Sequence, residues 1–583
     1  MKLNRLSELD DNSAIAAELV IVGGGATGLT IARECASAGM DVLVLESGLL
    51  DENGEHELLN TVDLAEPSLS GFDQLKRESF HGKQAEFWSA ERQPYGVRCR
   101  VLGGSTQAWA GKSSIFDEID FQTRPWVEHS GWPCDKAELA PYLSRALAAL
   151  NLCPADPPAR FGTGDLASYY WQFARSRLDR LDVMRMGKEF VADKPPAVRI
   201  LLDATVTHIA LDHSGGQVSS LEIASIAGKR AKVVARTVVL AASAIENARL
   251  LLASNDVHGT GIGNGRDNVG RYLVDHVGVT IGSIPEPHVA AMAQLFGFYG
   301  IRHGGRSHMF MHGLALTPEV QEREHLLNAS IYFAPQRADD DPWDAMKRLL
   351  RRKSGNVVRD LTSIARGSSF IAKGFGMTLL ASPVVPGVLK DSIVNGAIRW
   401  SPNMVADEFE RGGLPHKLTG LTLEAISEQA PCPDNRITLS DRTDRFGVPI
   451  AKVRWQVSQQ ERRTLRRLAE LADTALKASG LPRPELEEWA AGGFDQRVPA
   501  IDMAHSMGTT RMSHDPASGV VDSNCRVHDV RNLYIAGGSV FPTGGHANPT
   551  LMMLACAIRL ADHLSDQRGR DAVCARDLLT ISE

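Results

Sequence analysis

The sequence has no excess of positive charge. Its 583 residues include 63 Lys and Arg against 70 Asp and Glu, a formal net charge of −7. A chain with this balance has no general positive field to attract the phosphates of nucleic acid. We therefore expect a small neutral or cationic molecule as its partner, and no nucleic acid.

Paired cysteines and patterns of metal ligands are absent as well. None of the eight cysteines falls in a C-x-x-C pair. That spacing is typical of zinc sites, and regularly spaced cysteines are typical of disulfide frameworks. We expect neither a bound metal nor disulfides, and a reducing compartment is the default.

The sequence also lacks an export signal and a long apolar run. Glu8, Asp10 and Asp11 stand where a signal peptide would be basic. In the centre, a basic stretch (343–366) precedes an uncharged one (374–389), which is interrupted by proline and shorter than the roughly 20 apolar residues that span a bilayer. We expect a cytoplasmic protein with a mobile cap over its site. Peripheral membrane contact is the less favoured alternative.

What is present is the composition of a folded protein. Hydrophobic residues make up 43% and charged residues 23%, which excludes disordered, collagenous and coiled-coil chains. No repeat of fixed period is seen, which excludes solenoids and propellers. The length predicts two or more packed units.

The first motif predicts a dinucleotide site. An apolar run (18–22) ends in Gly-Gly-Gly-Ala-Thr-Gly (23–28), and a helical pattern and a second apolar run follow. Gly23 allows the tight turn, Gly25 lets a pyrophosphate approach, and Gly28 lets helix and sheet pack closely. Glu46, 18 residues after Gly28, is placed to accept hydrogen bonds from ribose hydroxyls. The motif alone does not separate FAD from NAD.

Further elements follow from the residue pattern. Residues 201–240 alternate β-rich runs, which predict a small sheet that returns to the nucleotide fold, and 243–254 predict a helix. Ser458 and Glu461 form a capping box that opens a helix ending at Gly480. The less regular region 285–454 is expected to face the substrate.

A second glycine-rich loop includes Gly103, Gly104, Ser105 and Thr106. Its amides and hydroxyls are suited to wrap a flavin ribityl chain or a phosphate. Alone it is equally consistent with a surface turn. A folded-over dinucleotide such as FAD needs a second loop of this kind, and that favours the functional interpretation.

The C-terminal part holds the candidates for catalysis. His505 is the candidate general base, because an imidazole titrates near neutrality. Asn548, followed by Pro549 and an apolar periodic run, predicts a helix start with Asn as the N-cap. His546 is a second candidate, whereas His514 and His528 are interpreted as solvated or structural.

Together these segments resemble the glucose-methanol-choline (GMC) oxidoreductase family of FAD enzymes, in the branch of bacterial sugar dehydrogenases and pyranose oxidases. The resemblance covers most of the chain. It is carried by GGGATG with Glu46, LGGSTQAW (102–109), VVLAASAIENARLLL (238–252), EQAPCPDNRITLS (428–440), HSMGT (505–509) and the segment that ends in GGHANPT at Thr550.

The resemblance implies roles for particular residues. His505 would be the catalytic base, Asn548 would complete a His-Asn pair that holds the substrate hydroxyl, and His546 would be auxiliary. FAD contacts are expected from Gly23, Gly25, Ala26, Thr27, Gly28, Glu46, Gly103, Gly104, Ser105, Thr106, Val206, Ala242, Gly538, Asn548, Pro549 and Thr550.

Three positions depart from the family pattern. Ala108 stands where pyranose oxidases carry a His linked to the flavin, so we expect non-covalent FAD. Ala110 replaces a Thr, which leaves efficient reaction with oxygen open. Ser243 stands where Gly is common, so the crowding of the backbone near the cofactor is expected to differ.

The expected fold is α/β, with a Rossmann-like FAD-binding domain (1–120, 195–284 and 500–583) interleaved with an α+β substrate domain on an antiparallel sheet (121–194 and 285–499). The expected reaction is oxidation of a primary or secondary alcohol, on a sugar, amino sugar or glycoside, with hydride transfer to flavin N5. The acceptor that reoxidises the flavin is left open among oxygen, a quinone and a redox protein. A lyase with structural FAD and an oxidase of non-sugar alcohols are the alternatives.

Overall fold

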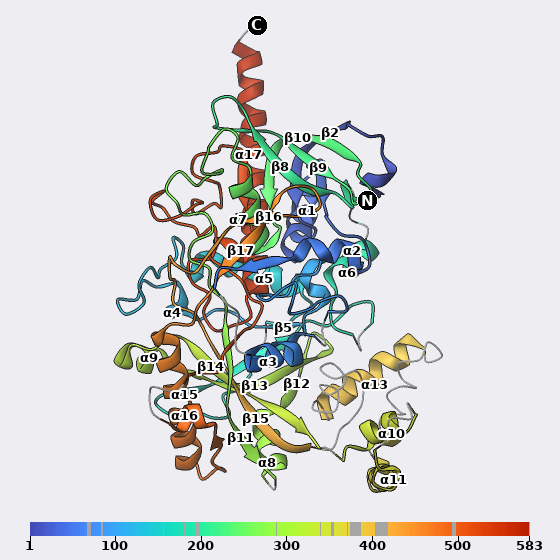
Figure 1. The fold of residues 1–583 in the computed structure, drawn as a ribbon, viewed down its shortest axis with the longest axis vertical. Coiled ribbons are helices and arrows are strands. Elements are labelled where there is room, and N and C mark those ends of the chain that lie inside the picture. Colours follow the sequence, from blue (N-terminus) through green and yellow to red (C-terminus); the bar gives the residue numbers. More distant parts are fainter. Residues whose placement is uncertain are drawn as a thin grey trace.

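The structure is a computed structural model. It describes the chain except for residues 67–70, 83–84, 155–156, 180–181, 194, 196, 287, 339, 351–354, 370, 373–385, 401, 403–417, 493–496 and 582–583. Two large sheets organise it, one near each end of the long axis (Figure 1).

The first sheet has the strand order β1-β7-β3-β2-β10-β9-β8, with β20 beside β10. Its centre is parallel, and β8, β9 and β10 pair antiparallel as the predicted return to the sheet. Residues 19–22 and 42–45 are buried on both faces, as in the core of a parallel sheet. The strands are β1 (Lys2–Arg5), β2 (Ser13–Val22), β3 (Val42–Leu45), β7 (Val198–Leu202), β8 (Thr205–Leu211), β9 (Val218–Ala224), β10 (Arg230–Leu240) and β20 (Leu533–Ile535).

Helices from distant parts of the sequence cover this sheet. The C-terminal helix α17 (Thr550–Ile581) packs against α1 (Ala26–Ser37) and α5 (Lys136–Ala149), and in Figure 1 it projects beyond the sheet. The predicted helix after β10 is α7 (Ser243–Ala253). Since the two ends of the chain share one core, cofactor-binding segments far apart in sequence become neighbours.

The second sheet is antiparallel, in the order β18-β11-β15-β14-β13-β6-β5 with β12 and β19 at its side. The predicted helix is α15 (Gln459–Ala478), which has the Ser458–Glu461 capping box and buries Leu465, Leu468 and Leu476. The strands are β5 (Lys112–Ser113), β6 (Leu166–Phe173), β11 (Val277–Pro285), β12 (Phe298–His303), β13 (Arg306–Leu316), β14 (Ala329–Arg337), β15 (Leu418–Ser427), β18 (Glu485–Leu486) and β19 (Ile501–Asp502).

The predicted fold class is confirmed, but the sheets do not follow the expected domain bounds. β11 begins at Val277, inside the segment expected to bind FAD, yet it belongs to the second sheet. In a third sheet, β16 (Arg436–Thr443) and β17 (Pro449–Arg454) come from the segment expected to bind substrate, and β4 (Val62–Leu64) comes from a segment expected to bind FAD. Its Ile437 and Val453 pack into the core of the first sheet. The pairing of strands decides where the chain passes from one sheet to another. The composition of the sequence does not mark these places.

Smaller helices surround the sheets. They are α2 (Gly54–Glu57), α3 (Gly71–His81), α4 (Glu118–Phe121), α6 (Met186–Asp193), α8 (Val289–Phe296), α9 (Pro318–Glu324), α10 (Pro342–Leu350), α11 (Val357–Arg366), α13 (Gly387–Trp400) and α16 (Glu488–Ala491), with short 3-10 turns at Leu6–Glu8, Leu58–Asn60, Gly104–Gln107 and Gly538–Val540.

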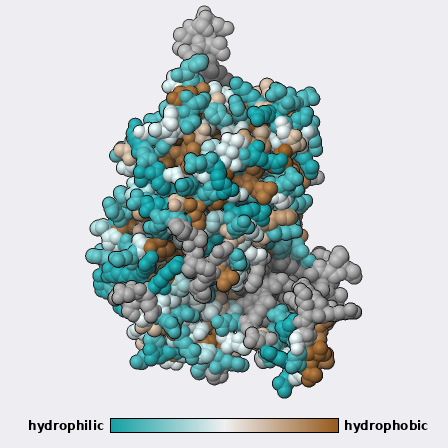
Figure 2. Space-filling model, viewed as in Figure 1, coloured by the Kyte–Doolittle hydropathy of each residue, from teal (hydrophilic) through white to brown (hydrophobic). Residues whose placement is uncertain are grey.

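The central basic stretch forms α10 and α11, and most of the uncharged stretch (374–385) lies outside the described residues. On α11, Asp360 is buried and paired with Arg348, whereas Val358 and Leu361 are exposed. Figure 2 shows a hydrophobic area at the end of the molecule where α10 and α11 lie. Within the described parts of the chain, no helix is both long enough and apolar enough to cross a bilayer.

Candidate active site

A cavity of about 1310 Å³ lies between the two large sheets. Val22, Leu45 and Val206 line it from the first sheet, and Tyr332 and Ile426 from the second. Most predicted site residues line this cavity: Gly23, Gly25, Ala26, Thr27, Glu46, Gly103, Gly104, Ser105, Thr106, Val206, Ala242, His505, Gly538, Asn548, Pro549 and Thr550.

The first glycine turn has the geometry that its sequence predicts. Gly23 has φ +105°, and a Cβ there would lie 2.6 Å from the Ala241 carbonyl oxygen. A Cβ on Gly28 would lie 2.0 Å from the Gly23 carbonyl oxygen, so Gly28 serves helix packing and does not line the cavity. At Gly25, the N-cap of α1, a Cβ would meet no heavy atom of the protein within 4 Å. This open space at a helix N-terminus suits a phosphate group.

Glu46 is held in place at the end of β3. Its two carboxylate oxygens accept hydrogen bonds from the backbone N–H of Gly24 (2.8 Å) and of Gly48 (2.7 Å). Burial raises the pKa of Glu46, and the two N–H donors oppose that rise. The carboxylate therefore ties the glycine turn to the second strand while it lines the cavity.

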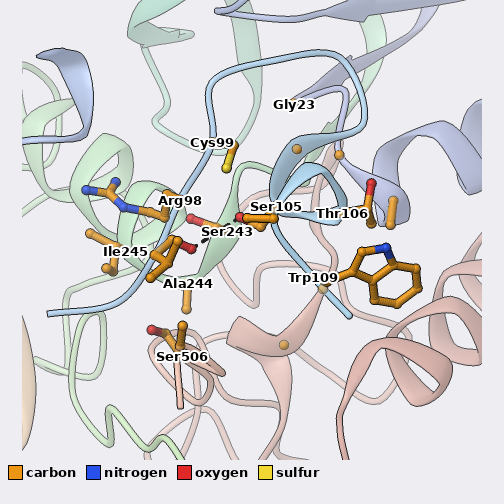
Figure 3. A pocket seen from close by; sticks show the side chains of 18 of the residues that line it. Gly23, Arg98, Cys99, Ser105, Thr106, Trp109, Ser243, Ala244, Ile245 and Ser506 are labelled. Carbon is orange, nitrogen blue, oxygen red and sulfur yellow. Dashed lines mark hydrogen bonds between the residues drawn. The ribbon is translucent and has the colours of Figure 1, made fainter. Parts of the chain in front are cut away.

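The second glycine loop packs directly on the first. Gly103 has φ +100°, and its N–H donates to the Gly24 carbonyl oxygen at 2.7 Å. A Cβ on Gly104 would lie 3.0 Å from the Gly25 Cα. Figure 3 shows Ser105, Thr106 and Trp109 of this segment, with Ser243, Ala244 and Ile245 of α7, around the pocket. The two loops form one cradle.

Two non-glycine residues in the cavity wall adopt left-handed backbone. Ser243 has φ +82°, a backbone conformation that glycine adopts more readily than serine. Ala504 has φ +59° and directly precedes His505. Such a conformation persists only where its surroundings enforce it, and it directs the following side chain toward the cavity wall.

His505 and Asn548 meet at the cavity, 43 residues apart in sequence. Asn548 Nδ2 lies 3.2 Å from His505 Nε2. Burial, followed by the charge of nearby His276, lowers the pKa of His505 well below 6.5. The imidazole is therefore neutral at neutral pH and can accept a proton.

The prediction that Asn548 caps a helix is wrong. Helix α17 begins at Thr550, and no donor among the described residues reaches the buried Asn548 Oδ1. The side chain turns toward His505 instead of toward the helix amides. The residue lines the cavity, and its Nδ2 faces His505 there.

His546 does not line the cavity within the described parts of the chain. Its Nε2 lies 3.3 Å from Asp117 Oδ2, and its ring packs edge-on against Tyr169. His514 is exposed and His528 is partly buried, in line with their expected roles.

Sequence reasoning missed two residues that support the pair. His276 Nδ1 lies 2.8 Å from His505 Nδ1. Asp275 accepts hydrogen bonds at Oδ1 from the backbone N–H of His276 (2.8 Å), His505 (3.0 Å) and Met503 (3.1 Å). Burial and the nearby Asp502 raise the pKa of Asp275 to about 8. Asp275 and His276 lie in none of the glycine motifs, so only an alignment would have singled them out.

Charged side chains in the wall were also missed. Glu246 is surrounded by Arg98 (2.6 Å), Arg100 (3.1 Å) and Arg249 (3.1 Å). Burial would raise the pKa of Glu246, but the three guanidinium groups lower it. On the side of the second sheet, Lys112 Nζ lies 3.6 Å from the centre of the Tyr332 ring.

These features fit a long dinucleotide. The open N-cap at Gly25, the buried acid Glu46 and the second loop at Gly103 suit its phosphates and ribose. The His505–Asn548 pair lines the same cavity.

Comparisons with known proteins agree with this geometry. Residues 431–557 match the family model described as GMC oxidoreductase, and residues 21–49 match the NAD(P)-binding Rossmann-like domain. The chain is 24% identical to paromamine 6'-oxidase of Streptomyces fradiae, over 93% of this chain and 90% of the relative. It is also 24% identical to 2-methyl-1,2-propanediol dehydrogenase of Mycolicibacterium austroafricanum, over 97% and 98%.

A solved structure of formate oxidase from Aspergillus oryzae RIB40, which concerns FAD modification, superposes with a TM-score of 0.52. It shares 18% identity and covers 97% of this chain and 100% of that one. The protein is thus an oxidoreductase with a Rossmann-like dinucleotide fold that acts on CH-OH groups. Its residues 431–557 match the GMC oxidoreductase family, and this match, with the likeness to formate oxidase, points to FAD as the cofactor.

Proposed function

We propose that the protein oxidises a primary or secondary alcohol of a sugar, amino sugar or glycoside to an aldehyde or ketone, with His505 as the base. The observation that carries the proposal is the His505–Asn548 pair at the wall of the cavity. Two relatives are named for paromamine and 6'''-hydroxyparomomycin C, and others for fructose and pyranose. Those names support the substrate class.

His505 and Asn548 have different roles in this reaction. A substrate hydroxyl that contacts both side chains would donate its proton to His505 Nε2 and accept a hydrogen bond from Asn548 Nδ2. The proton goes to His505, and the C–H electron pair leaves as hydride while the carbonyl bond forms. FAD, when bound, supplies the hydride acceptor at N5.

Other residues of the chain hold the cofactor. The glycine turn with Gly25 would bind the pyrophosphate, and Glu46 the adenosine ribose. We propose that FAD is bound non-covalently, because Ala108 offers no nucleophile where pyranose oxidases carry a linked His. We further propose that the central segment caps the site, since Asp344 of α10 lines the cavity.

The test is anaerobic reduction of the bound flavin, followed by loss of its visible absorption. The substrates are paromamine, glucosamine, glucose, a methyl glycoside and 2-methyl-1,2-propanediol. We expect at least one sugar to bleach the wild type and His505→Ala to slow bleaching by about 10² to 10⁴ with FAD still bound. His514→Ala, an exposed histidine of the same segment, is the matched control.

The result also separates the alternatives. Unchanged bleaching in His505→Ala would remove His505 as the base. Bleaching by the diol alone would favour an oxidase of non-sugar alcohols. Absence of bleaching by every alcohol, together with cyanohydrin cleavage, would favour the lyase. Repeating turnover with oxygen, a quinone and a dye identifies the class of acceptor.

A further inference from the structure

We infer that His276 fixes the tautomer of His505, so that Nε2 is unprotonated and ready to accept a proton before substrate arrives. This inference rests on the proposed role of His505 and adds a positioning residue to it. It starts from three consecutive contacts: Gly544 carbonyl oxygen to His276 Nε2 (3.2 Å), His276 Nδ1 to His505 Nδ1 (2.8 Å), and His505 Nε2 to Asn548 Nδ2 (3.2 Å).

The direction of these hydrogen bonds follows from the first contact. A backbone carbonyl oxygen only accepts, so His276 Nε2 must carry the hydrogen. A neutral imidazole has one N–H, and His276 Nδ1 is then an acceptor. His505 Nδ1 must therefore donate to it, which leaves the lone pair of His505 on Nε2.

The far end of the chain of contacts is consistent with this direction. Asn548 Nδ2 is a donor, and it faces the His505 Nε2 that the first two contacts leave as an acceptor. The opposite arrangement would place the His276 Nε2 lone pair against the Gly544 carbonyl oxygen and the Asn548 N–H against an N–H. Both are repulsive in a buried site.

The surroundings keep both rings neutral and in place. Burial lowers the pKa of His276 to about 4. The ring of His276 packs edge-on against that of His505, with centroids 4.9 Å apart. The Asp275 carboxylate accepts from the main chain of both histidines and fixes the two segments in register.

The arrangement has a consequence for proton transfer. When His505 Nε2 takes the hydroxyl proton, Nδ1 keeps its hydrogen and its bond to His276. The imidazolium then forms without rotation of the ring and with its second N–H already paired. An unpaired N–H in a buried cation would cost free energy. Because His276 pairs this N–H, its presence should raise kcat more than it changes KM.

The direct test is the tautomer of His505 in the holoenzyme. Protein labelled with ¹⁵N-histidine is examined by NMR through the couplings of each ring nitrogen to its ring C–H protons, and the His505→Ala variant assigns the signals. We expect a protonated Nδ1 and an unprotonated Nε2. A protonated Nε2 in the wild type at neutral pH overturns the inference, whatever the activity.

Two substitutions extend the test. His276→Leu removes the acceptor, so the His505 signals should show a mixture of tautomers, and kcat for flavin reduction should fall about 10- to 100-fold with little change in KM. His276→Asn offers an amide oxygen near the place of Nδ1 and should restore the single tautomer and most of the rate. A Leu variant with the wild-type tautomer and rate would count against the inference.

His312→Leu is the matched control, because His312 is another buried histidine bonded to a carbonyl oxygen, that of Leu295, in the second sheet. It should leave the His505 signals unchanged. If His505→Ala does not slow flavin bleaching, the proposed function fails independently of the tautomer. If His505→Ala is slow but Nε2 carries the hydrogen, this inference alone fails.

Discussion

A substitution at Gly25 tests cofactor binding separately from folding. Its backbone is ordinary, with φ −74° and ψ −179°, and a Cβ would meet no heavy atom of the protein within 4 Å. Gly25→Val should therefore fold. The expected cost is the loss of a favourable N-cap residue, about 1 kcal/mol or less of unfolding free energy. The added methyl groups, however, project into the space proposed for the pyrophosphate.

The expected loss of FAD affinity can be estimated from the hydrogen bonds at risk. A bond from a backbone N–H to a charged phosphate contributes about 1.5 to 3 kcal/mol. Loss of one such bond weakens binding by about 10- to 100-fold. Titration of the apoprotein with FAD, followed by flavin fluorescence, measures this change, and thermal unfolding of the apoprotein measures the effect on the fold.

Two further variants serve as comparisons for Gly25→Val. Gly265→Val also adds a side chain in open space, on the exposed surface, and should change neither measurement. Gly28→Ala should prevent folding, since its Cβ would lie 2.0 Å from a carbonyl oxygen. If Gly25→Val binds FAD as tightly as the wild type, the phosphate does not lie at this helix N-terminus and the reasoning is refuted.

Three further outcomes are expected. Because burial holds the pKa of His505 well below 6.5, the rate of flavin reduction should lose its base only as pH falls below that value, and an acid limb near pH 7 in the rate profile would contradict this. Acid precipitation should release FAD into the supernatant, since Ala108 has no nucleophile; flavin retained in the pellet would show a covalent link. Arg124→Met should lower the free energy of unfolding in urea by about 3 to 5 kcal/mol, because it leaves buried Glu428 without its partner, and an unchanged midpoint would count against that pairing.

Local sequence patterns were sufficient where the chemistry is local. The turn at Gly23 needs a positive φ, and the capping box at Ser458 needs only residues three apart, so both were predicted from short segments. The alternation of buried strands likewise indicated the class of the fold. These features depend on neighbours in sequence.

Local sequence patterns left the direction of a side chain open where it has both a local and a distant partner. Asn548 precedes a proline and an apolar run, the local signature of an N-cap, yet its amide faces His505. His546 shares the same short segment but turns to Asp117, away from the cavity. Sequence spacing does not specify which of two directions a loop side chain takes.

By itself, the sequence determined an α/β oxidoreductase with a dinucleotide turn, a second glycine loop and a candidate base. Only the tertiary structure decided that β11 leaves the nucleotide part for the antiparallel sheet, and that Asp275 and His276, at the start of that strand, reach the loop of His505. The reason is physical. A hydrogen bond between residues 229 positions apart leaves no periodic or local trace in the sequence. Its partners meet only because β11 pairs with β19 and Val274 pairs with Met507.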